Sequence, residues 1–171
     1  MGEDARRNKR SEVLTSGFKR IAVVRVRGRT RIRKDIEDTL KMLKLTRVNY
    51  CTIVDDRETY SGMLSKVKDY VTWGEVDEED VAAILKNRGE LVGGKKLTDD
   101  YVKKNTKYSS IGAFAKSFVS FEAELQEIPN LNLFFRLHPP RKGYKGIKRS
   151  IKEGGALGNR GKLKELIYRM R

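Results

Sequence analysis

Apolar and polar positions alternate with a strand period at the start of the folded sequence and then change to a helical period. Residues 20–27, RIAVVRVR, alternate between two faces, which predicts a strand with Arg25 and Arg27 on the face of Val23. In residues 31–44, four apolar residues recur at spacings of four, four and three, namely Ile32, Ile36, Leu40 and Leu43. This spacing predicts an amphipathic helix, and Thr30 is the expected N-cap.

The same reading continues to residue 73. Residues 48–54 are rich in β-branched side chains and predict a second strand, residues 60–69 predict a helix, and residues 70–73 predict a third strand with Trp73 in the core. The order is strand–helix–strand–helix–strand. Right-handed crossovers favour both helices on one face of the sheet. We therefore expect the opposite face to be free to meet a partner.

Helical patterns dominate the next part of the chain. A helix is expected from Asp77 to Gly89, a short one from Thr98 and a longer one over residues 110–127, followed by a strand at 131–137. After two prolines the sequence becomes glycine-rich and basic, and it is expected to be extended, with a floppy tail as the alternative. Four apolar residues then share a helical face that should dock on the rest of the molecule, namely Leu163, Leu166, Ile167 and Met170.

The amount and distribution of charge indicate what kind of partner the protein binds. The 171 residues are 38% hydrophobic, enough for a real core, yet the formal net charge is +15. Residues 19–34 hold eight basic residues and no acidic one, residues 35–135 hold more acidic than basic residues, and residues 136–171 hold twelve basic and two acidic residues. An excess of this size, concentrated in two segments, indicates a polyanionic partner, with nucleic acid favoured over a membrane surface. A solvated basic face is the alternative.

No catalytic constellation is evident. The single cysteine and single histidine exclude an internal disulfide and a Cys/His zinc site within one chain, and Cys51 is expected to be a buried apolar residue. Asp55, Asp56 and Glu58 could be imagined as a carboxylate metal cluster, but acidic residues are also common in turns. No phosphate-loop or dinucleotide motif occurs, and the N-terminus lacks the apolar segment of a signal peptide. We therefore expect no enzyme, cofactor or metal, and a reducing cytoplasm as the location.

Four stretches together resemble a known family. They are RIAVVRVRGRTRIRKDIEDTLKMLKLTRVN, YSGMLSKVKDYVTWGEVD, FRLHPPRKGYKGIKR and GGALGNRGKLKELIYRMR. In this order they resemble large-subunit ribosomal protein thirty in its archaeal form, whose eukaryotic relative is number seven. The resemblance covers about residues 20–171, and the short bacterial form corresponds only to about residues 20–73.

The resemblance implies an α+β fold with a ferredoxin-like core, an α-helical insertion and a basic C-terminal extension. We expect an N-terminal tail (1–18), an RNA-binding core (19–74), a helical extension with a returning strand (75–137), and a basic extended segment with a C-terminal helix (138–171). Residues 1–18 are short and nearly neutral, so no function of the eukaryotic N-terminal arm is carried over. The implied role is a structural constituent of the large subunit that binds 23S-type ribosomal RNA, near 5S RNA and neighbouring ribosomal proteins, with no membrane partner.

The candidate RNA-binding residues come from both basic segments. They are Arg25, Arg27, Arg29, Arg31, Arg33, Lys34, Arg141, Lys142, Tyr144, Lys145, Lys148, Arg149, Lys152, Arg160 and Lys162. Tyr144 lies among cations, where an aromatic ring can stack on an unpaired base. Two alternatives stay open: an RNA-processing or RNA-modifying enzyme, and a free chromatin or regulatory binder.

Overall fold

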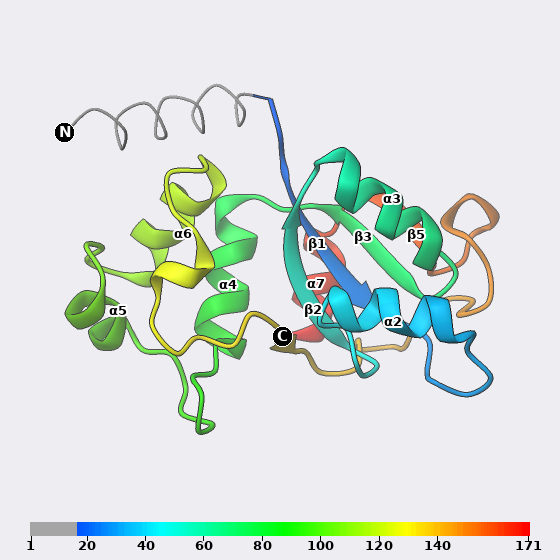
Figure 1. Ribbon diagram of the computed structural model, residues 1–171, viewed down its shortest axis with the longest axis horizontal. Helices are drawn as coiled ribbons and strands as arrows, with labels where there is room; N and C mark the ends of the chain where they lie inside the picture. Colours follow the sequence, from blue (N-terminus) through cyan, green and yellow to red (C-terminus); the bar gives the residue numbers. More distant parts are fainter. Residues whose placement is uncertain (1–16) are drawn as a thin grey trace.

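The computed structural model describes residues 17–171 (Figure 1). Its elements in chain order are β1 (Arg20–Arg25), α2 (Lys34–Met42), β2 (Tyr50–Asp55), α3 (Glu58–Val67), β3 (Val71–Glu75), α4 (Glu78–Arg88), α5 (Asp99–Asn105), α6 (Ile111–Val119), a 3-10 turn (Leu125–Glu127), β4 (Phe135–Arg136), a second 3-10 turn (Ile151–Glu153), β5 (Gly158–Lys162) and α7 (Lys164–Met170). The predicted strand–helix–strand–helix–strand order of the core is confirmed.

The five strands form one mixed sheet in the order β4-β2-β1-β3-β5. Strand β1 lies in the centre and pairs antiparallel with both β2 and β3, while β5 pairs in parallel with β3. The chain thus passes from β2 through α3 to β3 across the central strand, the split arrangement of ferredoxin-like folds. The α+β, ferredoxin-like class is confirmed.

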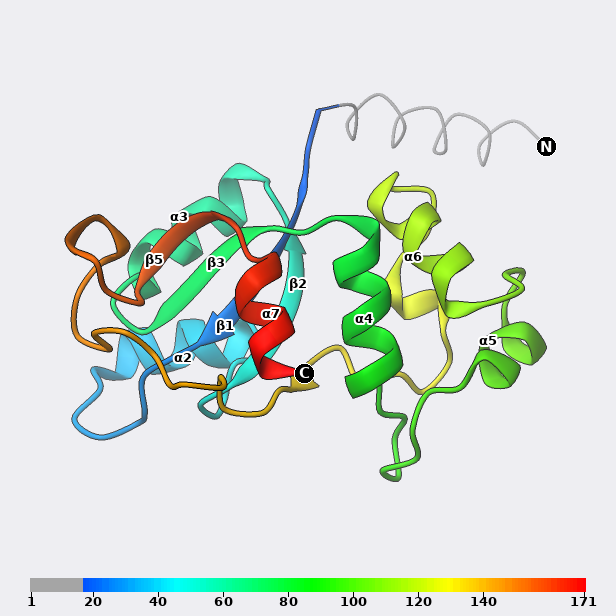
Figure 2. The same cartoon turned by 180° about the vertical axis from the view of Figure 1, so that it is seen from behind.

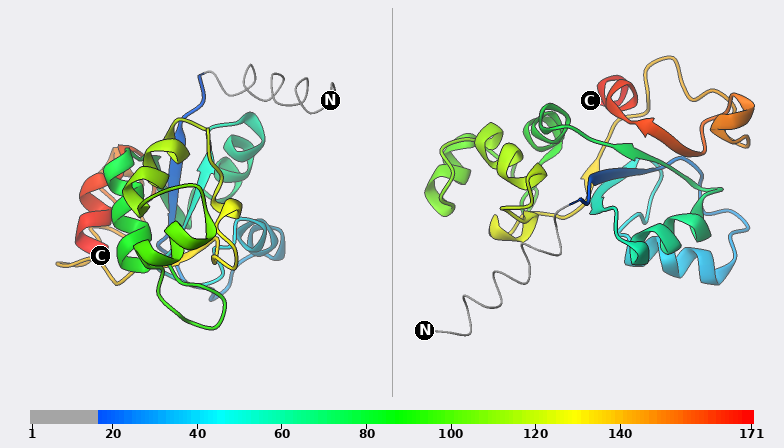
Figure 3. Two further views of the ribbon diagram at one scale, coloured as in Figure 1. Left: turned by 90° about the vertical axis from the view of Figure 1, so that its left-hand side faces the viewer. Right: turned by 90° about the horizontal axis from the view of Figure 1, so that it is seen from above.

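Helices α2 and α3 cover one face of the sheet, as the crossover argument predicted (Figure 3, right). Leu40 of α2, the C-cap residue Leu43, and Leu64 and Val67 of α3 pack in one buried cluster with Val23 of β1. Helix α2 begins at Lys34 and not at residue 31, because Arg31 has a left-handed φ of 55° that no α-helix accommodates. Arg33 is therefore the N-cap, and the assignment of Thr30 was wrong.

The opposite face of the sheet is not free, so that expectation was wrong. Ala22, Val24 and Cys51 on this face are fully buried against α4, α7 and the segment around Phe135. Figure 2 views the molecule from this side and shows α7 in front of the sheet, near β1 and β2. The predicted apolar stripe of α7 covers this face because Leu163, Leu166, Ile167 and Met170 are all buried. Local periodicity predicted that this helix docks on the rest of the molecule, but it carried no information on which surface the helix covers.

Helices α4, α5 and α6 form a lobe beside the sheet (Figure 1), and the helix starts predicted at Asp77 and Thr98 are confirmed. Asp77 is the N-cap of α4, and Thr98 Oγ1 accepts the N–H of Tyr101 at 3.3 Å at the start of α5. The predicted helix over 110–127 is shorter, because α6 ends at Val119 and Phe121 has a left-handed φ of 62°. The predicted strand over 131–137 is reduced to Phe135–Arg136.

The basic C-terminal segment is compact where an extended one was expected. Lys142, Gly143, Gly146 and Gly154 all have positive φ, so the chain reverses repeatedly before it enters β5. Gly155 lies so close to the carbonyl of Arg149 that a Cβ there would be 2.1 Å from its oxygen. This close approach requires glycine and closes the loop on itself.

Candidate nucleic-acid interface

The buried side chain of Arg25 stabilises the basic loop after β1 by hydrogen bonds to backbone carbonyls. Its guanidinium donates to four backbone carbonyls: Nε to Arg27 at 2.9 Å, Nη1 to Leu45 at 2.8 Å and Thr46 at 3.1 Å, and Nη2 to Gly28 at 3.0 Å. Burial lowers the pKa of Arg25, but a guanidinium stays charged in proteins. Arg25 was a candidate for RNA contact, and its position assigns it instead to holding the loop.

The remaining cations of this segment lie on the surface. Arg27 is half-buried, its guanidinium 4.9 Å from the ring centroid of Tyr70 and 3.1 Å from the carbonyl of Asp69. Arg29 pairs with Glu37 at 2.7 Å, and Arg33 pairs with Asp35 at 3.3 Å. Arg31 and Lys34 are exposed and form no ion pair with a carboxylate of residues 17–171.

The second basic segment is less neutralised than the first. Most of its candidates are exposed, namely Arg141, Lys142, Lys145, Lys148, Arg149, Lys152 and Lys162, and none is paired with a carboxylate of the described chain. Arg160 is half-buried and donates from Nε to Thr72 Oγ1 at 3.2 Å, and its burial lowers its pKa. Fixed positive charge without a protein counter-ion is what a phosphate backbone requires of its partner.

Tyr144 is held in the fold. Its hydroxyl donates to Asn49 Oδ1 at 2.9 Å, its ring packs against both buried clusters on the α7 face, and its burial raises its pKa. The expectation that this ring is a base-stacking platform does not fit this position. Tyr144 instead anchors the basic segment to the loop before β2.

The structure brings parts of the two basic segments together around one groove of about 750 Å³. Arg27 and Arg33 come from the first segment, and Lys148 and Lys152 come from the second. The loop at 26–33 and the loop at 145–157 lie at the same end of the molecule, on the right in Figure 1. This groove between the segments is called the basic groove below.

Most of the lining of the basic groove was not among the candidates, including Lys68, Tyr70 and Trp73. Lys68 follows α3 in a part of the chain with more acidic than basic residues, so charge counting had no signal for it. Tyr70 and Trp73 also line the groove and are half-buried. Trp73, which was expected in the core, packs against the buried cluster beneath α2 and α3 as well. Only the parallel pairing of β5 with β3 brings the second segment alongside these groove residues.

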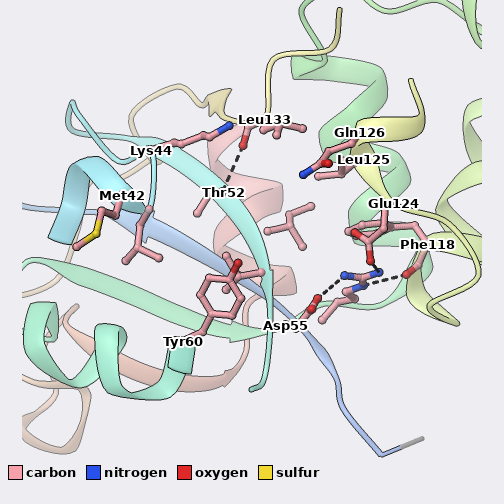
Figure 4. Close-up of a pocket in the computed structure, with 14 residues that line it drawn as sticks. Met42, Lys44, Thr52, Asp55, Tyr60, Phe118, Glu124, Leu125, Gln126 and Leu133 are labelled. Carbon is pink, nitrogen blue, oxygen red and sulfur yellow. Dashed lines mark hydrogen bonds and ion pairs between the residues drawn. The ribbon is translucent and has the colours of Figure 1, made fainter. Parts of the chain in front are cut away.

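The other basic residue of β1 has no part in the groove. Arg20 is buried where the sheet meets the helical lobe, and its guanidinium binds Asp55, the carbonyl of Phe118 at 3.0 Å and Glu124 at 2.9 Å (Figure 4). It also lies 4.0 Å from the ring centroids of Phe118 and Phe121. The cavity at this joint is about 210 Å³. Arg20 is thus a structural tie between sheet and lobe.

The first member of the possible carboxylate metal cluster, Asp55, has a structural role in the ion pair with Arg20. Asp55 ends β2, is buried, and pairs with Arg20 and with Arg57 at 2.7 Å. Across residues 17–171 no group of three or more His, Cys, Asp or Glu is placed to hold a metal ion. Cys51 is fully buried, which raises the pKa of its thiol to about 12. Over the same residues, none of the helices has the length and apolar character needed to cross a membrane.

Comparison with known proteins gives the family. The model of the family described as "Ribosomal protein L30p/L7e" matches residues 21–71, which span β1 to the start of β3. "Large ribosomal subunit protein uL30" of Methanopyrus kandleri is 57% identical over 148 residues, covering 85% of this chain and 99% of that protein. The chain belongs to the L30p/L7e family.

Other members of the L30p/L7e family agree over the same span. The protein of the same name from Methanoregula boonei is 51% identical over 152 residues, covering 88% of this chain and 99% of its own. That of Methanobrevibacter smithii is 48% identical over 149 residues, covering 86% and 97%. The archaeal-type resemblance read from the sequence is confirmed, and L30p/L7e proteins are structural ribosomal proteins and not enzymes.

Proposed function

We propose that this chain is a structural constituent of the large ribosomal subunit, where it binds and stabilises folded ribosomal RNA. The observation that carries the proposal is the convergence of two basic segments, far apart in sequence, on one groove. The names of the archaeal relatives support the assignment to the large subunit.

The mechanism is phosphate neutralisation on a preformed surface. The Arg25 guanidinium fixes the first loop and the Tyr144 hydroxyl fixes the second. The exposed candidate cations of the second segment, and Arg31 and Lys34 of the first, have no carboxylate partner within residues 17–171, whereas Arg29 and Arg33 pair with Glu37 and Asp35. Because A-form helices hide most base identity, such a surface recognises RNA by backbone shape. Cations from two loops can bridge RNA elements that are distant in the RNA sequence.

The same proposal also specifies which RNA and which neighbours the chain contacts. We assign the groove to 23S-type ribosomal RNA, with 5S RNA and other ribosomal proteins as neighbours, on the strength of the family resemblance. Residues 19–74 and 138–171 would supply the RNA contacts. The lobe within residues 75–137 carries eleven acidic and nine basic residues, so it suits a protein neighbour better than a phosphate backbone.

Sedimentation of tagged protein from a cell lysate tests the proposal. We expect co-sedimentation with the large subunit in moderate and high salt, and its loss after RNase treatment. A variant with Arg33, Lys148 and Lys152 replaced by alanine should be depleted from the subunit peak. The charge-matched control replaces Lys86, Lys95 and Lys103, three exposed cations of the lobe, and should sediment like the unmodified chain.

Protein that stays at the top of the gradient in both salts would contradict the ribosomal assignment. An equal loss from the groove variant and the lobe variant would contradict the assignment of the groove. Binding to duplex DNA as tight as binding to ribosomal RNA at matched salt would favour a free chromatin or regulatory binder.

A further inference from the structure

The basic groove holds aromatic rings as well as cations. Tyr70 and Trp73 line it together with apolar side chains that include Ile36 and Leu157. Its charged lining is five cations, Arg27, Arg33, Lys68, Lys148 and Lys152, against two carboxylates, Asp69 and Glu153, so the groove keeps a net positive charge. Its volume of about 750 Å³ lies within the range of roughly 300–1,000 Å³ that is typical of small-molecule sites. A surface that only neutralised phosphates would need neither the concavity nor the rings.

Trp73 and Asn159 are neighbours in the groove. They are register partners in the parallel pairing of β3 and β5, so their side chains project from the same face of the sheet. This is also the face of Val23, the register partner of Trp73 on β1. The Trp73 ring is half-buried, while the Asn159 side chain is exposed. An indole therefore lies beside an amide at one edge of the sheet.

The amide of Asn159 is oriented by a hydrogen bond within β5. Its Oδ1 accepts the backbone N–H of Gly161 at 2.8 Å. Gly161 lies within β5 and has a left-handed φ of +71°, where the register between β3 and β5 shifts as in a β-bulge. With the oxygen occupied, the NH₂ group is left as the hydrogen-bonding group that Asn159 presents to the groove, and it is a donor.

An aromatic ring beside a fixed amide donor suits an unpaired RNA base that is not stacked within a duplex. Bases within an A-form duplex are stacked on one another, and side chains reach mainly phosphates and 2′-hydroxyls. Unpaired bases instead stack on aromatic side chains and offer their ring-nitrogen and carbonyl acceptors to donors. The surrounding cations would hold the phosphates on either side of such a nucleotide.

We propose that the basic groove binds one unpaired nucleotide of the RNA, with its base against Trp73, its acceptor edge toward Asn159 and its flanking phosphates on Arg33, Lys148 and Lys152. This inference rests on the proposed RNA-binding function and adds the kind of RNA structure that the groove accepts.

Trp73 is the single tryptophan of the chain, so intrinsic fluorescence reports on the groove directly. The experiment titrates the full chain with two probes matched in phosphate number, a single-stranded oligouridylate and a blunt RNA duplex whose two strands are joined by a non-nucleotide linker. Fluorescein-labelled copies of both report total binding by anisotropy at about 0.15 M ionic strength. We expect quenching of Trp73 by the single strand and little change with the paired stem.

Two substitutions test the contribution of the Asn159 side-chain amide to nucleotide binding. Asn159→Asp keeps an oxygen for the Gly161 N–H but loses the donor, and Asn159→Ala loses the donor without adding charge. Both should weaken the quenching titration by about 2- to 10-fold, the value of one hydrogen bond. Asn87→Asp, at an exposed position of α4, adds the same charge in the lobe and should leave the titration unchanged.

The outcomes separate this inference from the function on which it rests. Anisotropy that reports RNA binding without quenching of Trp73, or equal quenching by both probes, would overturn the nucleotide site while leaving the RNA-binding proposal in place. Absence of binding to either probe and to large-subunit ribosomal RNA would overturn both.

Discussion

The two ends of strand β1 each bury an arginine, but the two guanidiniums are held by different chemistry. Arg20 lies among the carboxylates of Asp55 and Glu124 and between two phenylalanine rings. Arg25, five residues later, is surrounded by carbonyl oxygens alone. Arg20 is therefore neutralised within the protein, whereas the charge of Arg25 has no carboxylate partner.

This difference places the positive surface at one end of the molecule. At the Arg20 end, acidic residues balance the cation and the helical lobe closes over it. At the Arg25 end, the same side-chain type shapes a loop whose other cations point outward, and the second basic segment folds beside it. One strand thus carries a structural joint at one end and the base of a charged surface at the other.

The largest effect is expected at the joint. Arg20→Ala leaves the buried carboxylate of Asp55 without its main partner and should lower the free energy of unfolding by about 3–5 kcal/mol. Chemical denaturation measures this change. Arg57→Ala is the control, because Arg57 pairs with the same carboxylate from an exposed position and should cost about 1 kcal/mol or less. Equal losses in both variants would contradict the structural tie.

A smaller loss is expected at the other end of the strand. Arg25→Ala leaves the carbonyls of Leu45 and Thr46 without their donor, and we expect unfolding to become easier by about 2–3 kcal/mol. The same variant should bind large-subunit ribosomal RNA more weakly, because the loop of residues 26–33 loses its internal support. Arg20→Ala at a temperature where it is still folded should bind RNA normally, and a matching loss of RNA binding there would erase the distinction between the two ends.

The exposed arginines test the surface itself. Replacing Arg29, Arg31 and Arg33 together by alanine should lower affinity for large-subunit ribosomal RNA at least about tenfold and reduce the slope of log K against log salt by about 2 to 3. Circular dichroism should be unchanged, since these side chains lie outside the buried clusters. Loss of the circular dichroism signal would mean that the loop is part of the core.

The smallest effect concerns Glu37, which pairs with Arg29 beside the basic groove. Glu37→Gln removes one negative charge and should speed RNA association roughly two- to threefold. The Arg29 guanidinium lowers the pKa of Glu37, so the pair persists above the ordinary value of 4.5 and is lost as pH falls through the lowered value. Stopped-flow measurements should therefore show the variant's advantage shrinking as pH falls, because protonated Glu37 is as neutral as glutamine. An advantage that grew at low pH would assign the effect to another group.

The periodicity of apolar residues in the sequence predicted which helix faces are buried, because these faces depend only on local spacing. The apolar faces of α2, α3 and α7 follow a helical repeat, and all three faces are buried as expected. Strand β5 was missed because GNRGK contains no β-branched or aromatic residue, and its pairing with β3 is held by close backbone approach. A Cβ on Gly74 would lie 2.7 Å from the carbonyl oxygen of Gly161. Such proximity leaves no hydrophobic pattern in the sequence.

The candidate nucleic-acid interface was likewise predicted only as far as local sequence allowed. Counting charge located both basic segments, but it treated Arg20 and Arg25 like their exposed neighbours, because net charge carries no information on burial. It also passed over Lys68 and Trp73, whose place beside the second segment depends on the sheet order. Charge composition therefore found the kind of partner, and only tertiary pairing found the groove.

Helix α7 has a consequence for how the molecule is made. Its residues cover a sheet face whose strands β1, β2 and β3 lie near the other end of the sequence. Synthesis runs from the N-terminus, so the sheet can pair, and α2 and α3 can dock, long before α7 exists. Until then Val24 and Cys51 lack part of their apolar cover, and the nascent chain presents a surface that favours aggregation or a chaperone. The groove is incomplete for the same interval, because β5, which supplies part of its lining, immediately precedes α7.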